Sequence, residues 1–243
     1  MILYNTIQNN FTTLLRAGTF NITGTQLRPM SLYKWRRLLL LASQLGVSGY
    51  ISTGLHLLKH DPMLPKEIIT DIDEDQYDSS NALLFNYFKQ KRYISIQDEE
   101  RHSIDTSIET MELLQILISN AREITVSDIN LNGIIAIGKY LRTKGDRVDF
   151  VKLSEWIHKL GIEQVVSMIG SLLIDLFDFE IQELEIIKRL YVNTLSHYNE
   201  LVSSALDGKK AKLRSSSKIN IAMIETASYH IGLFTSKIRN IEE

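Results

Sequence analysis

One run of apolar residues, VVSMIGSLLIDLF (Val165–Phe177), gives the strongest indication of the fold. Drawn as a helix, it is apolar on nearly all sides, and such a helix needs other helices around it. The run carries Asp175, and it is shorter than the roughly 20 residues that a membrane-spanning helix requires. We therefore predict a buried core helix over 163–177.

The composition favours helices around that core. The chain has 243 residues, 44% of them hydrophobic and 23% charged, with a formal net charge of −2, as in an ordinary soluble protein of one large or two small domains. Only three prolines and 12 glycines leave little turn chemistry for an all-β fold. The prolines all lie within the first 65 residues, so none interrupts a helix beyond that point. We predict an all-α fold, a single irregular bundle of eight to ten helices.

Apolar spacing of three and four residues places the individual helices. The predicted helices cover residues 2–17, 32–45, 47–59, 80–91, 98–121, 128–144, 149–160, 163–177, 180–206 and 219–241.

Capping residues mark several helix ends. Ser31 and Asp149 are the expected N-caps, and Gly46 and Gly161 the expected stops. The helix beginning near residue 2 is expected to end near Gly18.

Two further features concern pairing between elements. The tight polar connection at 143–147 predicts that the helices on either side of it are antiparallel neighbours. Residues 93–96 and 124–126 have β-like composition. One short two-stranded β pairing between these two segments is therefore an alternative prediction.

The chain divides into three parts by composition. Residues 1–206 form the predicted bundle, 207–218 a basic serine-rich loop, and 219–243 a C-terminal helix packing on the bundle. An acidic stretch at 61–80 contrasts with the basic run from Lys209 to Lys218. Both runs are typical of solvated surface segments.

The sequence lacks cysteine, which excludes disulfide frameworks, thiol nucleophiles, cysteine zinc sites and iron–sulfur clusters. Any metal would need His, Asp or Glu ligands. The N-terminus has neither a basic region nor an unbroken apolar region of the kind found in secretory signals, so we predict a cytoplasmic protein without a membrane span.

Two Glu-x-x-His pairs have the spacing found in ferritin-like di-iron bundles, Glu99 with His102 and Glu155 with His158. Helical projection places both pairs across from the apolar face of their helices, whereas di-iron ligands point into the core. We therefore assign no metal residues to them.

The other histidines give no stronger signal. His56 and His60 are four residues apart and followed by Asp61, but both are expected to point away from the core face of their helix. His197 and His230 have no Ser, Asp or Glu at a spacing that suggests a nucleophile and its base.

Asp71 and Asp73 are the candidates for a magnesium site, because two carboxylates two residues apart on a strand face the same way. They follow a predicted helix, where their side chains would diverge, and the glycine-rich phosphate-binding motifs are missing from the sequence. The run Lys209–Lys218 lacks interleaved aromatic residues, so we do not expect nucleic-acid binding. Lys34–Arg37 is expected to be the exposed side of a helix with Trp35 in the core.

Several helix-packing sequences carry a resemblance to a known family. They are FTTLLRAG at 11–18, the segment 35–41, ASQLGVSG at 42–49, Pro65–Glu67 and, more weakly, 145–161 and 163–177. Together they resemble the helical N- and C-terminal regions of a bacterial nucleotidyltransferase-like family. That family continues into an α/β core with a Lys-Gly turn and a metal-binding Asp-x-Asp strand, where this chain continues with polar and helical sequence at 80–121. The resemblance implies the helical framework without the catalytic core, as in an accessory protein or a degenerate paralogue.

We predict a non-catalytic protein that acts by contact with another protein, and we assign no catalytic, cofactor-binding or metal-binding residues and no cofactor. The contact surface would be an apolar groove between helices, or the charge asymmetry between 61–80 and 209–218. The alternative is a divergent magnesium-dependent nucleotidyltransferase that uses Asp71 and Asp73. A third hypothesis is nucleic-acid binding through 209–218, with strong salt dependence.

Overall fold

The computed structural model describes residues 2–68, 87–103, 107–126, 130–187, 190–191 and 194–207. Within these residues the chain forms nine α-helices and no strand, which confirms the predicted all-α fold of eight to ten helices. The α-helices are α1 (Ile2–Phe20), α2 (Leu32–Gln44), α3 (Ser48–Leu57), α4 (Tyr87–Arg101), α5 (Ile108–Val126), α6 (Leu131–Lys144), α7 (Phe150–Leu160), α8 (Glu163–Phe177) and α9 (Thr194–Leu206). Three short 3₁₀ helices are η1 (Lys66–Ile68), η2 (Gly145–Arg147) and η3 (Ile181–Glu183).

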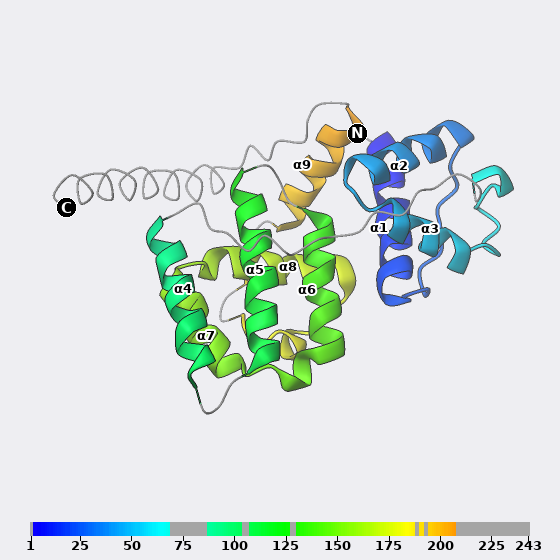
Figure 1. The fold of residues 1–243 in the computed structure, drawn as a ribbon. Helices are drawn as coiled ribbons and strands as arrows, with labels where there is room; N and C mark the ends of the chain where they lie inside the picture. Colours follow the sequence, from blue (N-terminus) through cyan, green and yellow to red (C-terminus); the bar gives the residue numbers. More distant parts are fainter. Residues whose placement is uncertain are drawn as a thin grey trace.

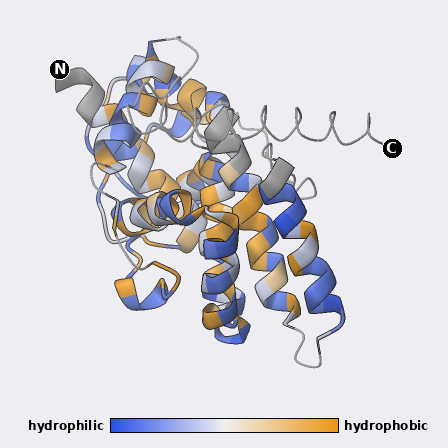
Figure 2. Cartoon of the chain, turned by 90° about the vertical axis from the view of Figure 1, so that its left-hand side faces the viewer, coloured by the Kyte–Doolittle hydropathy of each residue, from blue (hydrophilic) through white to orange (hydrophobic). Residues whose placement is uncertain are grey.

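The helices form two groups that meet at α8 (Figure 1). Helices α1, α2 and α3 pack together at one side of the molecule, and α4 to α7 lie at the other. Helix α8 contacts α1, α5, α6 and α9, so it joins both groups. Orange and blue segments alternate along most helices in Figure 2, as expected where each turn presents one side to the core.

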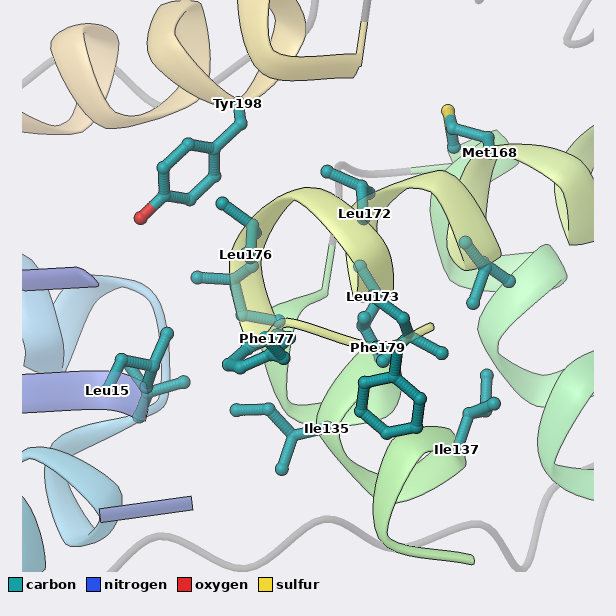
Figure 3. Close-up of a cluster of buried hydrophobic side chains, with 14 of the residues drawn as sticks. Leu15, Ile135, Ile137, Met168, Leu172, Leu173, Leu176, Phe177, Phe179 and Tyr198 are labelled. Atoms are coloured by element: carbon teal, nitrogen blue, oxygen red, sulfur yellow. The ribbon is translucent and has the colours of Figure 1, made fainter. Parts of the chain in front are cut away.

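The prediction that 163–177 is a buried central helix is confirmed. Its side chains are buried on almost every side, because neighbouring helices approach from several directions. Figure 3 shows this packing, with residues from α1, α6 and α9 around α8. The labelled members of the cluster are Leu15, Ile135, Ile137, Met168, Leu172, Leu173, Leu176, Phe177, Phe179 and Tyr198.

Two glycines allow α1 and α3 to approach closely. A Cβ at Gly18 would overlap the backbone oxygen of Tyr50, and a Cβ at Gly54 would overlap the backbone oxygen of Leu14. Gly18 therefore serves helix packing, and it lies close to the end of α1, as predicted. The helix continues to Phe20, whose ring packs against α8.

The helix ends agree with the predicted caps at most positions. The Asp149 side chain accepts the backbone N–H of Lys152, and Gly161 ends α7 with φ at 62°. Ser31 is the N-cap of α2, although its side chain makes no capping hydrogen bond. Gly46 follows α2 with φ at 65°, a left-handed conformation that suits glycine.

The alternative β pairing is not found, because 93–96 lies in α4 and 124–126 lies in α5. Tyr93 and Ile96 are buried while Ile94 is 48% exposed. A spacing of three between buried positions belongs to a helix, since a strand would bury alternate residues.

The predicted helix over 98–121 is wrong in its boundaries. Helix α4 ends at Arg101, and α5 begins at Ile108. Ile108 is 64% exposed, although its helical spacing to Met111, Leu114 and Ile118 predicts that it lies on the same apolar face. Leu114 and Ile118 of the same predicted face are fully buried, as are Leu113 and Leu117 beside them.

Helix α7 packs against α4 and α5, so the prediction that it is the antiparallel neighbour of α6 is wrong. The connection forms η2, which is followed by an extended residue, Val148. This turn directs the chain away from α6 before α7 begins.

Several expectations lie outside the described residues. They concern most of the acidic stretch 61–80, Asp71, Asp73, the basic loop 207–218 apart from Asp207, the C-terminal helix 219–243 and His230.

Candidate functional site

The candidate site lies where the chain connects α8 to α9. The sequence predicts one long helix over 180–206, and this prediction is wrong. After α8 the chain makes the short helix η3, with Glu180 and Glu183 forming a capping box, and α9 begins only at Thr194. Between them, Leu184 and Ile186 are buried. The described part of this connection, 184–187 and 190–191, is not helical and packs on the core through these two side chains; we call it the irregular segment.

Two small residues of α8 position the irregular segment. Gly170 leaves the space that the Ile187 side chain fills, since a Cβ at Gly170 would overlap Ile187 Cδ1. The backbone N–H of Tyr191 donates to the Ser171 hydroxyl oxygen at 2.8 Å. The segment is thus fixed to α8 just before α9 begins.

A groove of about 300 Å³ results between α8, the irregular segment and α9. Its walls are mainly apolar, and its rim is exposed, with Leu190 47% and Leu195 48% accessible. The lining residues are Ser171, Ile174, Asp175, Leu190, Tyr191, Thr194 and Leu195. We call this feature the α8–α9 groove.

Asp175 is the acidic residue among the described residues that line the groove. Its main-chain oxygen accepts a hydrogen bond from Arg16 Nη2 at 2.9 Å, but its carboxylate makes no hydrogen bond or ion pair with any described residue. The carboxylate lies in the last turn of α8, where the helix dipole disfavours negative charge. The groove therefore offers an uncommitted, half-buried acceptor to a ligand.

Arg16 of α1 closes the C-terminal end of α8 beside the groove. Its Nε donates to the Leu176 main-chain oxygen, and its Nη2 lies 3.2 Å from the Asp178 carboxylate. The last carbonyls of a helix lack partners within the helix, so this guanidinium satisfies them. Arg16 thereby links the C-terminal end of α8, which carries Asp175, to α1.

The substitution Arg16→Met tests this role. Methionine keeps most of the packing volume but removes every donor, so we expect the free energy of unfolding to fall by about 2 kcal/mol. Urea denaturation measures it. Arg101→Met is the matched control, because the Arg101 side chain is 74% exposed and pairs with Asp98 at the surface; a loss no larger than that of the control would contradict the role of Arg16.

Tyr198 anchors α9, which forms one wall of the groove. Its ring is buried against α8 (Figure 3), and its hydroxyl lies 3.0 Å from the Thr12 hydroxyl of α1. Burial raises the pKa of Tyr198 to about 12, so the side chain stays neutral at physiological pH. Its role is to hold α9 in place.

The two Glu-x-x-His pairs are exposed, as predicted, with Glu99 on α4, His102 directly after it, and Glu155 and His158 on α7. Glu99 accepts from Lys159 Nζ at 3.1 Å, and His158 Nδ1 lies 2.6 Å from Glu163 Oε1 with an 83% exposed side chain. His102 Nδ1 lies 2.7 Å from the Asp98 main-chain oxygen. Glu99, His102 and His158 therefore serve contacts at the surface.

His56 and His60 are both exposed, as predicted, but they do not share a helix. Helix α3 ends at Leu57, so His60 lies in the following turn. Asp61 accepts the backbone N–H groups of Leu27 and Met63, which commits its carboxylate to holding this turn. His197 is half-buried, with its ring 6.2 Å from that of Tyr191. Trp35 is fully buried, as predicted.

A second charged cluster joins α5 to α6 and serves packing. Glu112 accepts from Lys144 and from the Tyr140 hydroxyl, each at 2.8 Å. The hydrogen bond from Lys144 holds the pKa of Glu112 below its usual value, and burial raises the pKa of Tyr140. The three side chains thus bind one another across the contact between α5 and α6.

Across the described ranges, no three His, Asp or Glu side chains lie close enough together to hold a metal ion. Every helix in the same part of the chain is too short or too polar to cross a lipid bilayer. Comparison with protein-family models, with characterised proteins and with solved structures finds no match to this chain. What the α8–α9 groove can bind therefore has to follow from its geometry and charge.

Proposed function

We propose that this protein is a non-catalytic helical protein that acts through protein–protein interaction, with the α8–α9 groove as its binding site. The observation that supports the proposal most is the uncommitted Asp175 carboxylate next to exposed apolar side chains. A carboxylate in the last turn of a helix interacts unfavourably with the helix dipole. It is available to a ligand that supplies a positive charge.

The shape of the groove favours a polypeptide ligand. A site for a small molecule typically encloses most of its ligand. Here, Leu190 and Leu195 stand half exposed on the rim, so a ligand has to extend beyond the groove to cover them. A segment of a partner protein can fill the groove with one side chain and cover the rim with its neighbours.

The lining specifies the chemistry of that segment. An apolar side chain fits against Ile174, Leu190 and Leu195, and a lysine or arginine beside it pairs with Asp175. Ser171 accepts the Tyr191 backbone N–H, so its hydroxyl also has a role in holding the wall of the groove. We expect a short apolar and basic motif in the partner.

Selection from a displayed random-peptide library tests the proposal while the partner is still unidentified. The full chain is the bait, and Asp175→Asn is used for counter-selection. We expect enrichment of peptides that place Lys or Arg next to a large apolar residue, with binding lost in Asp175→Asn and in Leu195→Asp. Asp98→Asn on α4 and Val151→Asp on α7 are the controls, because both positions are exposed and lie on other helices.

Two results would overturn the proposed site. One is that no motif is enriched over several rounds. The other is that the selected peptides bind Asp175→Asn and Leu195→Asp as tightly as the original protein.

We expect Asp175→Asn to leave the folded protein as stable as before or slightly more stable. The change removes a negative charge from the C-terminal turn of α8, a position where such charges cost about 0.3–1 kcal/mol. Thermal denaturation measures the effect. A marked fall in Tm would mean that the carboxylate has a structural role, which contradicts its assignment to ligand binding.

The non-catalytic part of the proposal makes a separate prediction. The resemblance to a bacterial nucleotidyltransferase-like family would make this chain an accessory or degenerate relative, and Asp71 and Asp73 lie outside the described residues. We expect no change in Tm with ATP, GTP, CTP or UTP in the presence of Mg²⁺. A ligand at 100 times its Kd adds about 2.7 kcal/mol to stability. A magnesium-dependent rise that disappears in Asp71→Ala or Asp73→Ala would support a divergent nucleotidyltransferase instead.

A further inference from the structure

Helix α2 carries large apolar side chains on its outer side as well as toward the core. Trp35, Leu38 and Leu41 are buried, whereas Tyr33 is 65% and Leu40 58% exposed. Tyr33 and Leu40 are seven residues apart and therefore lie on the same side of the helix. An amphipathic surface helix would place polar residues there. We call this side the outer face of α2.

The chain leaves the described part of the structure next to this helix. Helix α9 packs against α2, and Arg37 of α2 donates a hydrogen bond to the main-chain oxygen of Leu206. Val202 and Leu206 are buried at this end of α9. Asp207, the last described residue, is therefore close to α2.

The sequence that follows contains an apolar stripe at regular spacing. On a helix, residues spaced alternately by three and four lie along one side, and such a stripe needs a partner surface. The members of the stripe are Ile224, Ala227, Ile231, Phe234, Ile238 and Ile241. We call this part of the sequence the C-terminal stripe.

The connection is long enough to bring the stripe to α2. Residues 208–223 can span on the order of 50 Å when extended, since each residue contributes roughly 3.3–3.6 Å. The 13 residues of α2 extend over only about 20 Å.

We propose that residues 224–241 bind in cis to the outer face of α2, with the C-terminal stripe covering Tyr33 and Leu40. This contact is separate from the α8–α9 groove and does not depend on the proposed function. It would remove two large apolar side chains of α2 from water and give the stripe its partner surface.

Cysteine cross-linking tests the contact cleanly, because the chain contains no cysteine. Leu40→Cys is combined in turn with Ile231→Cys, Phe234→Cys and Ile238→Cys in the full chain, under mild oxidation. We expect at least one pair to form an intramolecular disulfide, seen as a faster monomer band on a non-reducing gel. Val151→Cys, at a 74% exposed position on α7, replaces Leu40→Cys in the control pairs.

Hydrogen–deuterium exchange provides a second measurement that does not depend on disulfide geometry. We expect peptides from 224–241 to exchange more rapidly in Leu40→Asp than in the unmodified chain, and Val151→Asp to leave them unchanged. The proposal is overturned if exchange is the same in all three proteins. It is also overturned if the Leu40 pairs cross-link no better than the Val151 pairs, or if only disulfide-linked dimers form, which would make a second copy the partner.

Discussion

Phe177→Ala is expected to lower the free energy of unfolding by about 3–5 kcal/mol, the usual cost of removing a fully buried aromatic side chain. Phe177 is 0% exposed at the end of α8, and its ring lies 5.2 Å from that of Phe20 in an edge-on arrangement. The substitution leaves a cavity where α1 and α8 meet. Because domains are commonly stable by only about 5–15 kcal/mol, a large part of the total would be lost.

Urea denaturation of the full chain measures this loss, with an unchanged slope indicating that only stability has changed. Val151→Ala on α7 is the control, since its side chain is 74% exposed and its effect should stay within about 0.5 kcal/mol. A loss below about 1 kcal/mol for Phe177→Ala would contradict the central position of α8.

Gly54→Ala is expected to destabilise the protein by about 3 kcal/mol, at the upper end of the range for overpacking. In most helices the same change stabilises, because alanine has the higher helix propensity. Here the new Cβ would overlap the Leu14 backbone oxygen of α1. That backbone has little room to move, because Leu14 and Leu15 are both fully buried.

Gly145→Ala is the matched control for this prediction. No described atom lies within 4 Å of its Cβ position, and the residue has a helical conformation. The control should be neutral or stabilising by up to about 1 kcal/mol. If Gly54→Ala behaved like the control, the close contact between α1 and α3 would be wrong.

Features that depend on local pattern could be predicted from the sequence. The apolar run of α8, the N-cap at Asp149 and the stop at Gly161 follow from residue type and spacing alone. The burial of Trp35 follows from the stripe of its own helix. In each case the local preference and the tertiary packing agree.

The irregular segment after α8 could not be predicted, because its apolar spacing is that of a helix. Leu184, Ile187 and Tyr191 fit a continuous helical stripe. Their actual conformation depends on Gly170, which makes room for Ile187, and on Ser171, which accepts the Tyr191 N–H. Both belong to another element, so tertiary packing overrides the local pattern.

The candidate site could not be predicted for the same reason. Asp175 is visible in the sequence as the one charged residue of the apolar run. Its availability depends on which groups surround it, and that is fixed only when α8, the irregular segment and α9 come together. An isolated carboxylate within a core helix is therefore a signal worth testing.

A charge-swap binding experiment tests the central claim most directly. A peptide selected on the full chain is labelled, and its affinity is measured by fluorescence polarisation. We expect Asp175→Asn to weaken binding about tenfold, which corresponds to about 1.4 kcal/mol. Replacing the basic residue of the peptide by Glu should abolish binding to the original protein, and Asp175→Lys should restore it. Unchanged affinity in Asp175→Asn, together with no restoration by Asp175→Lys, would contradict recognition through the α8–α9 groove.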